Sequence, residues 1–261
     1  MKGVILAGGS GTRLHPLTKV ISKQLLPVYD KPMIYYPLTT LILAGVNDVL
    51  VITRPEDAAS FRSLLGDGSE FGITISYAQQ EKPAGLAQAP LIAEAFLNGS
   101  GFCLILGDNF LYGPGLGRQL QNLDSVKGAT VFAYQVKDPR QYGVIELDSS
   151  GKPISIEEKP RNPKSDLAIP GLYFFDTDIV GICHKLKPSA RGELEITDAI
   201  KEYMSRNQLS VKVLPLGTAW LDMGSFESLL EAAEFVRIVQ SRQGVQIGDP
   251  ITAISNLLNP S

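Results

Sequence analysis

A glycine-rich turn and two cations near the N-terminus are the residues whose types and spacing most clearly indicate chemistry. The turn runs from Ala7 to Thr12 and ends at Arg13, and Lys23 follows further along the chain. Glycine lets backbone N–H groups approach an anion closely, and such backbone segments attract phosphate. Arg13 and Lys23 would add full positive charges at the same place. The pattern therefore predicts a cradle for a nucleoside triphosphate.

The two familiar glycine motifs fit this turn poorly. A P-loop needs Lys followed by Ser or Thr after its last glycine, whereas Gly11 is followed by Thr12 and Arg13. The dinucleotide-binding fingerprint needs a third small residue where this chain has Leu14. This spacing counts against a Rossmann dehydrogenase, although Asp30 lies roughly where a ribose-binding acid could sit.

Two acids far apart in the sequence could serve the same phosphates. Asp108 ends an apolar run, and Asp222 lies within the apolar context of Trp220 and Leu221. If the fold brings the two carboxylates together beside a triphosphate, they can hold Mg²⁺, which takes one or two carboxylates together with phosphates and waters. The alternative for Asp108 is an ordinary turn or capping residue, because Asp favours both.

Alternating strand and helix patterns must position these residues. The expected strands are 2–6, 48–53, 73–77 and 102–106, and the expected helices are 33–44, 55–65 and 85–97. This repetition predicts an α/β, Rossmann-like three-layer fold with a mainly parallel mixed sheet and helices on both faces. Ligands of such sheets bind outside the carboxyl ends of the strands, where both the glycine-rich turn and Asp108 fall.

The second half of the chain predicts a small β extension and two helices, then a strand and a closing helix. The strand candidates are 130–136, 143–147, 154–158, 167–175 and 210–214, and the helix candidates are 178–186, 195–207 and 225–242. Ser225 is a plausible N-cap of the closing helix, with Ser228 poorly placed for a capping box. We expect one domain over 1–244, with parts at about 1–128 and 129–224, and a short C-terminal tail over 245–261.

The composition excludes several classes of function. The chain has 261 residues, of which 44% are apolar, and a net charge of −3, which argues against general nucleic-acid binding. No apolar run approaches the roughly 18 residues of a membrane span. A strand at residue 3 leaves no room for a signal peptide, and two isolated cysteines suit a reducing cytoplasm. His15 and His184 are too isolated for a zinc site.

A series of motifs in a fixed order resembles the sugar-phosphate nucleotidylyltransferases over roughly residues 1–244. The motifs are 6–14, 22–36, 85–89, 106–109, 142–144, 157–160, 171–174 and 191–198. The most similar members of that family join dTTP and glucose 1-phosphate to give dTDP-glucose and pyrophosphate with Mg²⁺, by direct in-line attack at the α-phosphorus. The resemblance therefore implies the same reaction here, in a cytoplasmic homo-oligomer (a dimer or a tetramer).

The resemblance also implies a role for each matched position. Arg13 and Lys23 are the expected catalytic cations, and Asp108 and Asp222 the expected metal ligands. The positions matched to nucleotide binding are Gly8, Gly11, Thr12, Arg13, Lys23, Gln24, Gln80 and Gly85. The positions matched to sugar-phosphate binding are Asn109, Gly143, Glu158, Lys159 and Ile169, with Lys159 on the phosphate.

Three departures from the family pattern leave alternatives open. Ala84, Pro170 and Met223 stand where relatives commonly have Asp or Glu, Thr and a small polar residue. The nucleotide could then be UTP, or the sugar an amino-deoxy sugar 1-phosphate, with the same chemistry. A non-catalytic module that binds nucleotide sugars is a further alternative.

Overall fold

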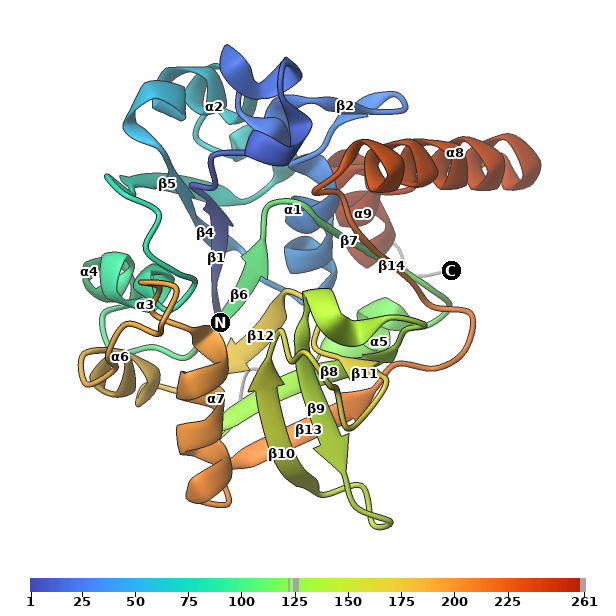
Figure 1. Ribbon diagram of the computed structural model, residues 1–261. Helices are drawn as coiled ribbons and strands as arrows, with labels where there is room; N and C mark the ends of the chain where they lie inside the picture. Colours follow the sequence, from blue (N-terminus) through green and yellow to red (C-terminus); the bar gives the residue numbers. More distant parts are fainter. Residues whose placement is uncertain (122, 124–126, 259–261) are drawn as a thin grey trace. The chain divides into compact units, whose positions relative to one another are not determined.

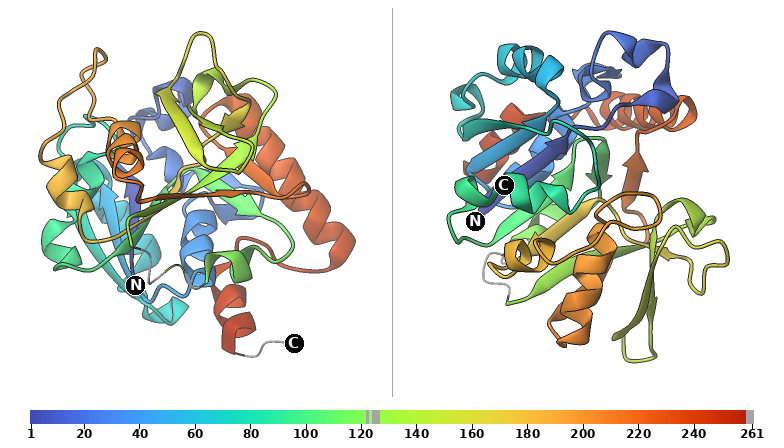
Figure 2. Two further views of the ribbon diagram at one scale, coloured as in Figure 1. Left: turned by 90° about the horizontal axis from the view of Figure 1, so that it is seen from below. Right: turned by 60° about the vertical axis from the view of Figure 1, so that its left-hand side comes forward.

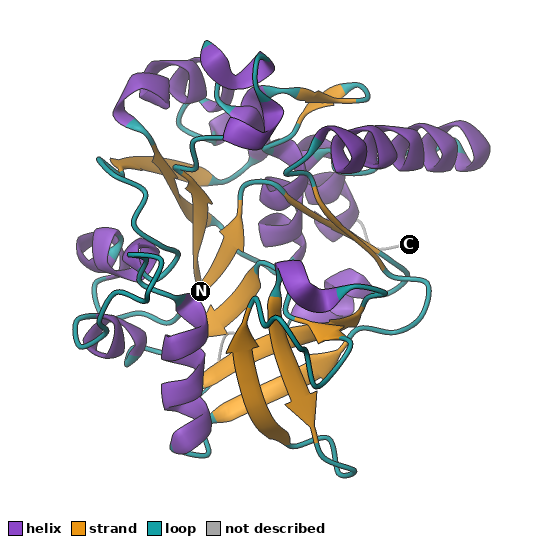
Figure 3. Ribbon diagram, viewed as in Figure 1, coloured by secondary structure: helices purple, strands orange, loops and turns teal. Residues whose placement is uncertain are grey.

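The computed structural model describes residues 1–121, 123 and 127–258. The chain divides into two compact units, and each of them is discontinuous in sequence. The first unit comprises Met1–Pro83, Ile105–Asn122 and Gly217–Ser261, and the second comprises Ala84–Leu104 and Leu123–Leu216. Figures 1 and 3 show the helices and strands of both units.

Parallel strands joined by helices form the first unit, as the apolar runs predict. Strands β1 (Lys2–Ala7), β4 (Asp48–Thr53) and β5 (Thr74–Gln79) pair in that order, with Lys2 opposite Asp48 and Asp48 opposite Thr74. The connections contain η4 (Pro55–Asp57), η5 (Ser69–Phe71), and helices α1 (Tyr35–Leu43) and α2 (Ala58–Leu65). Helix α1 begins two residues later than expected and carries Pro37 in its first turn, where proline is tolerated.

The remaining elements of the first unit include several that the sequence did not predict, among them β7 (Asn109–Tyr112) and α9 (Pro250–Leu258). Strand β6 (Phe102–Leu106), whose first three residues belong to the second unit, leads through a turn into β7, which pairs antiparallel with β14 (Ala219–Asp222). The expected C-terminal tail instead contains helix α9 (Pro250–Leu258), which packs against α1. The others are α5 (Leu116–Leu120), α8 (Phe226–Gln243), the hairpin β2–β3 (Pro27–Val28, Lys31–Pro32), and η1 (Thr12–Leu14), η2 (Leu17–Lys19) and η3 (Lys23–Leu25).

An aromatic and aliphatic cluster holds β7 and β14 to the helices of the first unit. It contains fully buried Met33, Tyr36, Phe110, Met223 and Val236, drawn from α1, β7, α8 and the segments that flank them. Figure 2 shows α8 as a long straight helix. The expectation about its start was partly wrong, because Ser225 and Ser228 do form a reciprocal capping box, with N–H···O distances of 3.1 and 3.2 Å.

The strands of the second unit form the mixed extension that the sequence predicts. Its strands are ordered β10 (Pro153–Glu158), β9 (Gly143–Leu147), β11 (Leu167–Ala168), β8 (Ala129–Gln135) and β12 (Leu172–Phe175), and they pair antiparallel. Strand β13 (Leu209–Val213) pairs parallel with β8. Its helices are α3 (Gln88–Ile92), α4 (Glu94–Leu97), α6 (Ile179–Cys183) and α7 (Ile196–Ser205), with η6 at Pro139–Gln141. The predicted α/β class with a mixed sheet is thus confirmed.

Two expected elements of the second unit are broken in the structure. The strand expected over 167–175 is split into β11 and β12, because Pro170 has no N–H to donate to a sheet. The helix expected over 85–97 begins only at Gln88, since Gly85 adopts a non-helical φ of 107°, and it is interrupted at Ala93. Within the described residues, no helix combines the length and apolar character of a membrane span.

Candidate active site

The glycine-rich turn after β1 is fixed by contacts that demand glycine. Gly11 has φ 63° and precedes η1, the short helix that carries Arg13. The Thr18 hydroxyl donates to the Gly11 carbonyl at 2.7 Å. A Cβ on Gly11 would lie 3.2 Å from Thr18 Cγ2 and 3.3 Å from Lys23 Cβ, so the turn is packed between these two side chains. The sequence thereby places Arg13 and Lys23 on one compact loop.

Lys23 lies along this loop and reaches the first of the two candidate metal ligands. Its Nζ is 3.9 Å from the position that a Cβ on Gly9 would take, and it forms an ion pair with Asp108 Oδ2. The two side chains are only 13% and 10% exposed. Burial raises the pKa of the Asp108 carboxyl, but Lys23 and a hydrogen bond from Asn109 outweigh it, so that pKa lies below its ordinary value of 3.8.

The second candidate metal ligand reaches the same place through a pair of strands. Asp222 on β14 is opposite Asn109 on β7, and the N–H of Met223 donates to the carbonyl of Asp108 at 2.9 Å. A Cβ on Gly224 would lie 2.5 Å from Arg13 Nη2 and 3.2 Å from Asp222 Oδ1. The first unit therefore brings Arg13, Lys23 and both acids to one region.

Buried glutamines pack against the two glycine turns of the first unit, one at Gly8 and one at Gly107. The side-chain amide of Gln80 fills the space that a Cβ on Gly8 would need. Gln24 is 2% exposed, accepts a hydrogen bond from Ser22 at 2.7 Å, and lies with its Cγ 2.9 Å from the Cβ position of Gly107. Gln24 thus supports the turn before Asp108, whereas Gln80 lies directly against the predicted phosphate cradle.

Most of the candidate sugar residues gather in the second unit. Glu158 is the register partner of Gly143, and the N–H of Ile169 donates to the Gly143 carbonyl at 2.8 Å. A Cβ on Gly143 would lie 3.4 Å from Glu158 Oε2. Lys159 has φ 43°, a conformation that costs energy for a non-glycine residue and is common at functional sites.

Two candidates have surroundings that the sequence did not indicate. Asn109, expected at the sugar, belongs to the first unit and hydrogen-bonds Asp108 Oδ1 at 3.2 Å. Gly85, expected at the nucleotide, belongs to the second unit, where a Cβ on it would overlap the carbonyl oxygen of Leu194.

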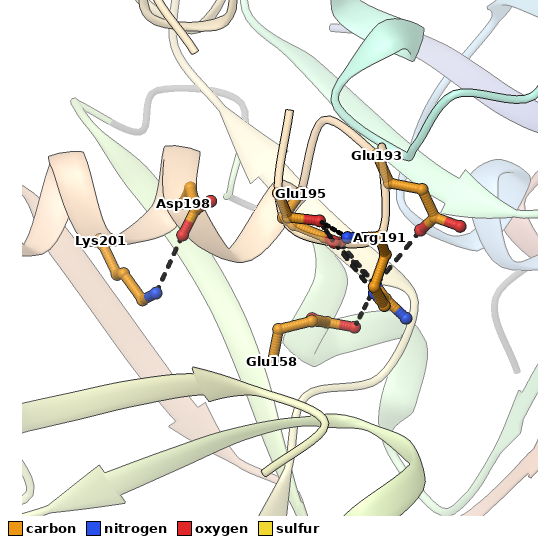
Figure 4. Close-up of polar contacts among 7 residues, drawn as sticks. Glu158, Arg191, Glu193, Glu195, Asp198 and Lys201 are labelled. Atoms are coloured by element: carbon orange, nitrogen blue, oxygen red, sulfur yellow. Dashed lines mark hydrogen bonds and ion pairs between the residues drawn. The ribbon is translucent and has the colours of Figure 1, made fainter. Parts of the chain in front are cut away.

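An arginine that the sequence analysis did not assign joins the sugar candidates. Arg191 binds Glu195 through Nε at 3.1 Å and Nη2 at 2.7 Å, and its Nη2 also lies 3.5 Å from Glu158 and 3.2 Å from Glu193 (Figure 4). Burial of the carboxyl is the main cause that raises the pKa of Glu158 above its ordinary value, and repulsion from Glu195 adds to it. The motif over 191–198 contained this residue, but the contact that links it to Glu158 is visible only in the fold.

Comparisons with known proteins agree with these features. A family model described as nucleotidyl transferase matches residues 2–238. Glucose-1-phosphate thymidylyltransferase of Mycolicibacterium smegmatis is 58% identical over 96% of this chain and 87% of its own length. The enzyme of the same name from Neisseria meningitidis is 59% identical over 95% of this chain and 86% of its own length.

Solved structures show the same fold. A Bacillus anthracis protein assigned as a glucose-1-phosphate thymidylyltransferase, solved with sucrose, superposes with a TM-score of 0.86 at 38% identity, covering 97% of this chain and 99% of that one. A UDP-glucose pyrophosphorylase solved with UDP-glucose has a TM-score of 0.80 at 27% identity, covering 91% and 98%. These matches confirm the resemblance inferred from the motifs: the chain belongs to the nucleotidyl transferase family.

Proposed function

We propose that this protein is a glucose-1-phosphate thymidylyltransferase that makes dTDP-glucose and pyrophosphate from dTTP and glucose 1-phosphate. The observation that carries the proposal is the grouping of Arg13, Lys23, Asp108 and Asp222 beside one glycine-rich turn. A module that only binds nucleotide sugars has no need of paired carboxylates next to a phosphate cradle. The high identity to enzymes of this name supports the choice of substrates.

The reaction needs positioning and charge neutralisation more than covalent chemistry from the protein. An oxygen of the sugar phosphate attacks the α-phosphorus of dTTP in line. The bond between the α-phosphorus and the oxygen that bridges to the β-phosphate breaks, and pyrophosphate leaves. Arg13 and Lys23 would stabilise the charge on the triphosphate and on the departing pyrophosphate. Backbone N–H groups of Gly8, Gly11 and Thr12 would bind phosphate oxygens, and Gln80 and Gly85 would contact the base.

The two acids fit a divalent cation. Asp108 forms an ion pair with the Lys23 ammonium, and Asp222 lies on β14, the strand that pairs with β7. Two carboxylates are enough for Mg²⁺, because that ion completes its shell with phosphates and waters. When bound, Mg²⁺ would supply positive charge at the phosphate oxygens.

The second unit would bind the sugar phosphate. Lys159 and Arg191 are its candidate phosphate ligands, since two anions must be brought together against their repulsion. The sugar hydroxyls would form hydrogen bonds with this unit. The carboxylate of Glu158 would accept them, and the backbone of Gly143 and Ile169 would accept or donate them. Arg191 is added to the residues matched by motif because it lies beside Glu158.

Pyrophosphate release measured over a panel of substrates tests the proposal. The panel pairs dTTP or UTP with glucose 1-phosphate or an amino-deoxy sugar 1-phosphate, because a structural relative was solved with UDP-glucose. We expect the highest kcat/KM for dTTP with glucose 1-phosphate. Binding without pyrophosphate release for any pair would instead indicate a non-catalytic module.

The Lys23→Ala variant tests the assigned chemistry. Loss of one preorganised electrostatic donor lowers kcat by on the order of 10²-fold or more. A near-normal rate in the folded variant would remove Lys23 from the reaction.

A further inference from the structure

We propose that Trp220 and Asn109 are positioning residues that fix the carboxylate of Asp108 for its cation. The inference rests on the proposed function, because it takes Asp108 as a ligand of a divalent metal. It gives Asn109 a different role from the sugar contact that its motif implies. It also gives a role to Trp220, the only tryptophan of the chain.

A continuous chain of hydrogen bonds carries the inference. Trp220 Nε1 donates to Asn109 Oδ1 at 2.7 Å, Asn109 Nδ2 donates to Asp108 Oδ1 at 3.2 Å, and Lys23 Nζ pairs with Asp108 Oδ2. Asn109 is 2% exposed, Asp108 is 7% exposed and Trp220 is 8% exposed. Hydrogen bonds between such buried groups restrict their orientation, because a lost partner is not replaced freely by water.

The chemistry of the two end groups determines which way the central amide points. The indole N–H can only donate, and an ionised carboxylate can only accept. The Asn109 amide therefore satisfies both neighbours in one orientation alone, with its oxygen toward Trp220 and its NH₂ toward Asp108. If the indole donor were removed, the Asn109 oxygen would lose its partner, and the amide would be held only by its hydrogen bond to Asp108.

The same series of hydrogen bonds leaves one carboxylate oxygen of Asp108 able to exchange its lysine partner for a metal ion. Oδ1 is held by Asn109, whereas Oδ2 is held by Lys23, a cation whose place a metal ion can take. The strand register supports this arrangement, because Asn109 is opposite Asp222 and Leu111 is opposite Trp220. Side chains at directly opposed and alternate positions share a face of a two-stranded ribbon. Trp220, Asn109 and Asp222 thus lie on one face.

Metal affinity measured without turnover tests the inference. The probe is Mn²⁺, followed by electron paramagnetic resonance with dTTP present and glucose 1-phosphate omitted. Trp220→Phe keeps an aromatic ring and removes the donor, and Asn109→Ser removes the bond to Asp108 from the other side. Loss of a hydrogen-bond partner of a metal ligand costs about 10-fold or more in metal affinity. We expect that loss in both variants, together with a higher Mg²⁺ requirement for activity.

Two controls separate this role from a structural or substrate role. Tyr112→Phe changes an aromatic residue on the same strand as Asn109 and should leave Mn²⁺ affinity unchanged. Thermal unfolding shows whether Trp220→Phe and Asn109→Ser are folded. If one of them is not, the Mn²⁺ affinity of the other tests the inference. Unchanged Mn²⁺ affinity with a raised KM for glucose 1-phosphate would overturn the inference and make these residues sugar contacts.

Asp108→Asn distinguishes failure of the inference from failure of the proposed metal site. We expect this variant to lose Mn²⁺ binding. If Asp108→Asn binds Mn²⁺ normally, Asp108 is no metal ligand, and both the metal assignment and the inference fall. If only Trp220→Phe and Asn109→Ser bind normally, the metal assignment stands and the positioning role alone is wrong.

Discussion

Substitution of Lys23 by Met should destabilise the fold through the charge that it leaves behind. Methionine keeps most of the length of the side chain and removes the ammonium that neutralises Asp108. The Asp108 side chain is only 10% exposed, so its carboxylate would remain in a poorly hydrated place without its cation. Removal of one partner of a buried ion pair costs about 3–5 kcal/mol. Because both partners retain some exposure, we expect about 3 kcal/mol, at the lower end of that range.

Thermal unfolding in the presence of a chelator measures this loss. For a protein of this size, about 3 kcal/mol corresponds to a fall in Tm of about 6–12 °C. Added Mg²⁺ should narrow the difference from the parent protein, because a metal ion at Asp108 replaces the missing charge. Lys201→Met is a matched control, since Lys201 pairs with Asp198 at 2.9 Å while both side chains remain well exposed, and it should leave Tm nearly unchanged (Figure 4).

A double substitution decides whether the unpaired charge is the cause. Lys23→Met combined with Asp108→Asn removes both charges, so it should be more stable than Lys23→Met alone. If the double variant is no more stable than the single one, the loss comes from side-chain packing, and the electrostatic argument for this pair is refuted.

Two further predictions concern the cradle and the sugar residues. Thr18→Val removes the hydroxyl that donates to the Gly11 carbonyl, and it should raise KM for dTTP by about fivefold, the equivalent of about 1 kcal/mol. Thr18→Ser keeps the hydroxyl and should retain the parent KM. Equal KM values for the two variants would contradict a role for the hydroxyl. Burial and Glu195 raise the pKa of Glu158 in the folded state, so the native form binds this proton more tightly than the unfolded chain, and stability falls as pH rises from about 4.5 toward that higher pKa. Glu158→Gln should flatten this part of the curve of unfolding free energy against pH, and an unchanged slope would show that the carboxyl does not titrate abnormally.

Local pattern was enough to predict the elements that carry the cradle. The bounds of β4 and β6 could be predicted directly, since strands buried on both faces contain continuous apolar runs, here 49–52 and 102–106. The spacing of Gly11, Arg13 and Lys23 predicted a phosphate site because it depends on backbone freedom and charge within one loop. The family could likewise be inferred from an ordered series of short motifs.

Elements that depend on distant partners could not be predicted in this way. Strand β7 has four residues and follows a turn, and it is stabilised by pairing with β14, more than a hundred residues away. Helix α9 lies in a weakly patterned tail, where packing of Ala253 and Ile247 into the first unit compensates for the lack of a strong local signal. Long-range packing commonly overrides local propensity in this manner.

The sequence by itself determined which residues could do the chemistry, and the tertiary structure decided which of them act on one another. Side-chain types and short spacings are local properties of the chain, so Lys23 and Asp108 could be named as candidates without a fold. The contacts of Asp108 with Lys23 and Asn109, and of Arg191 with Glu158, depend on strand register and on where loops return, which are set by packing over the whole chain.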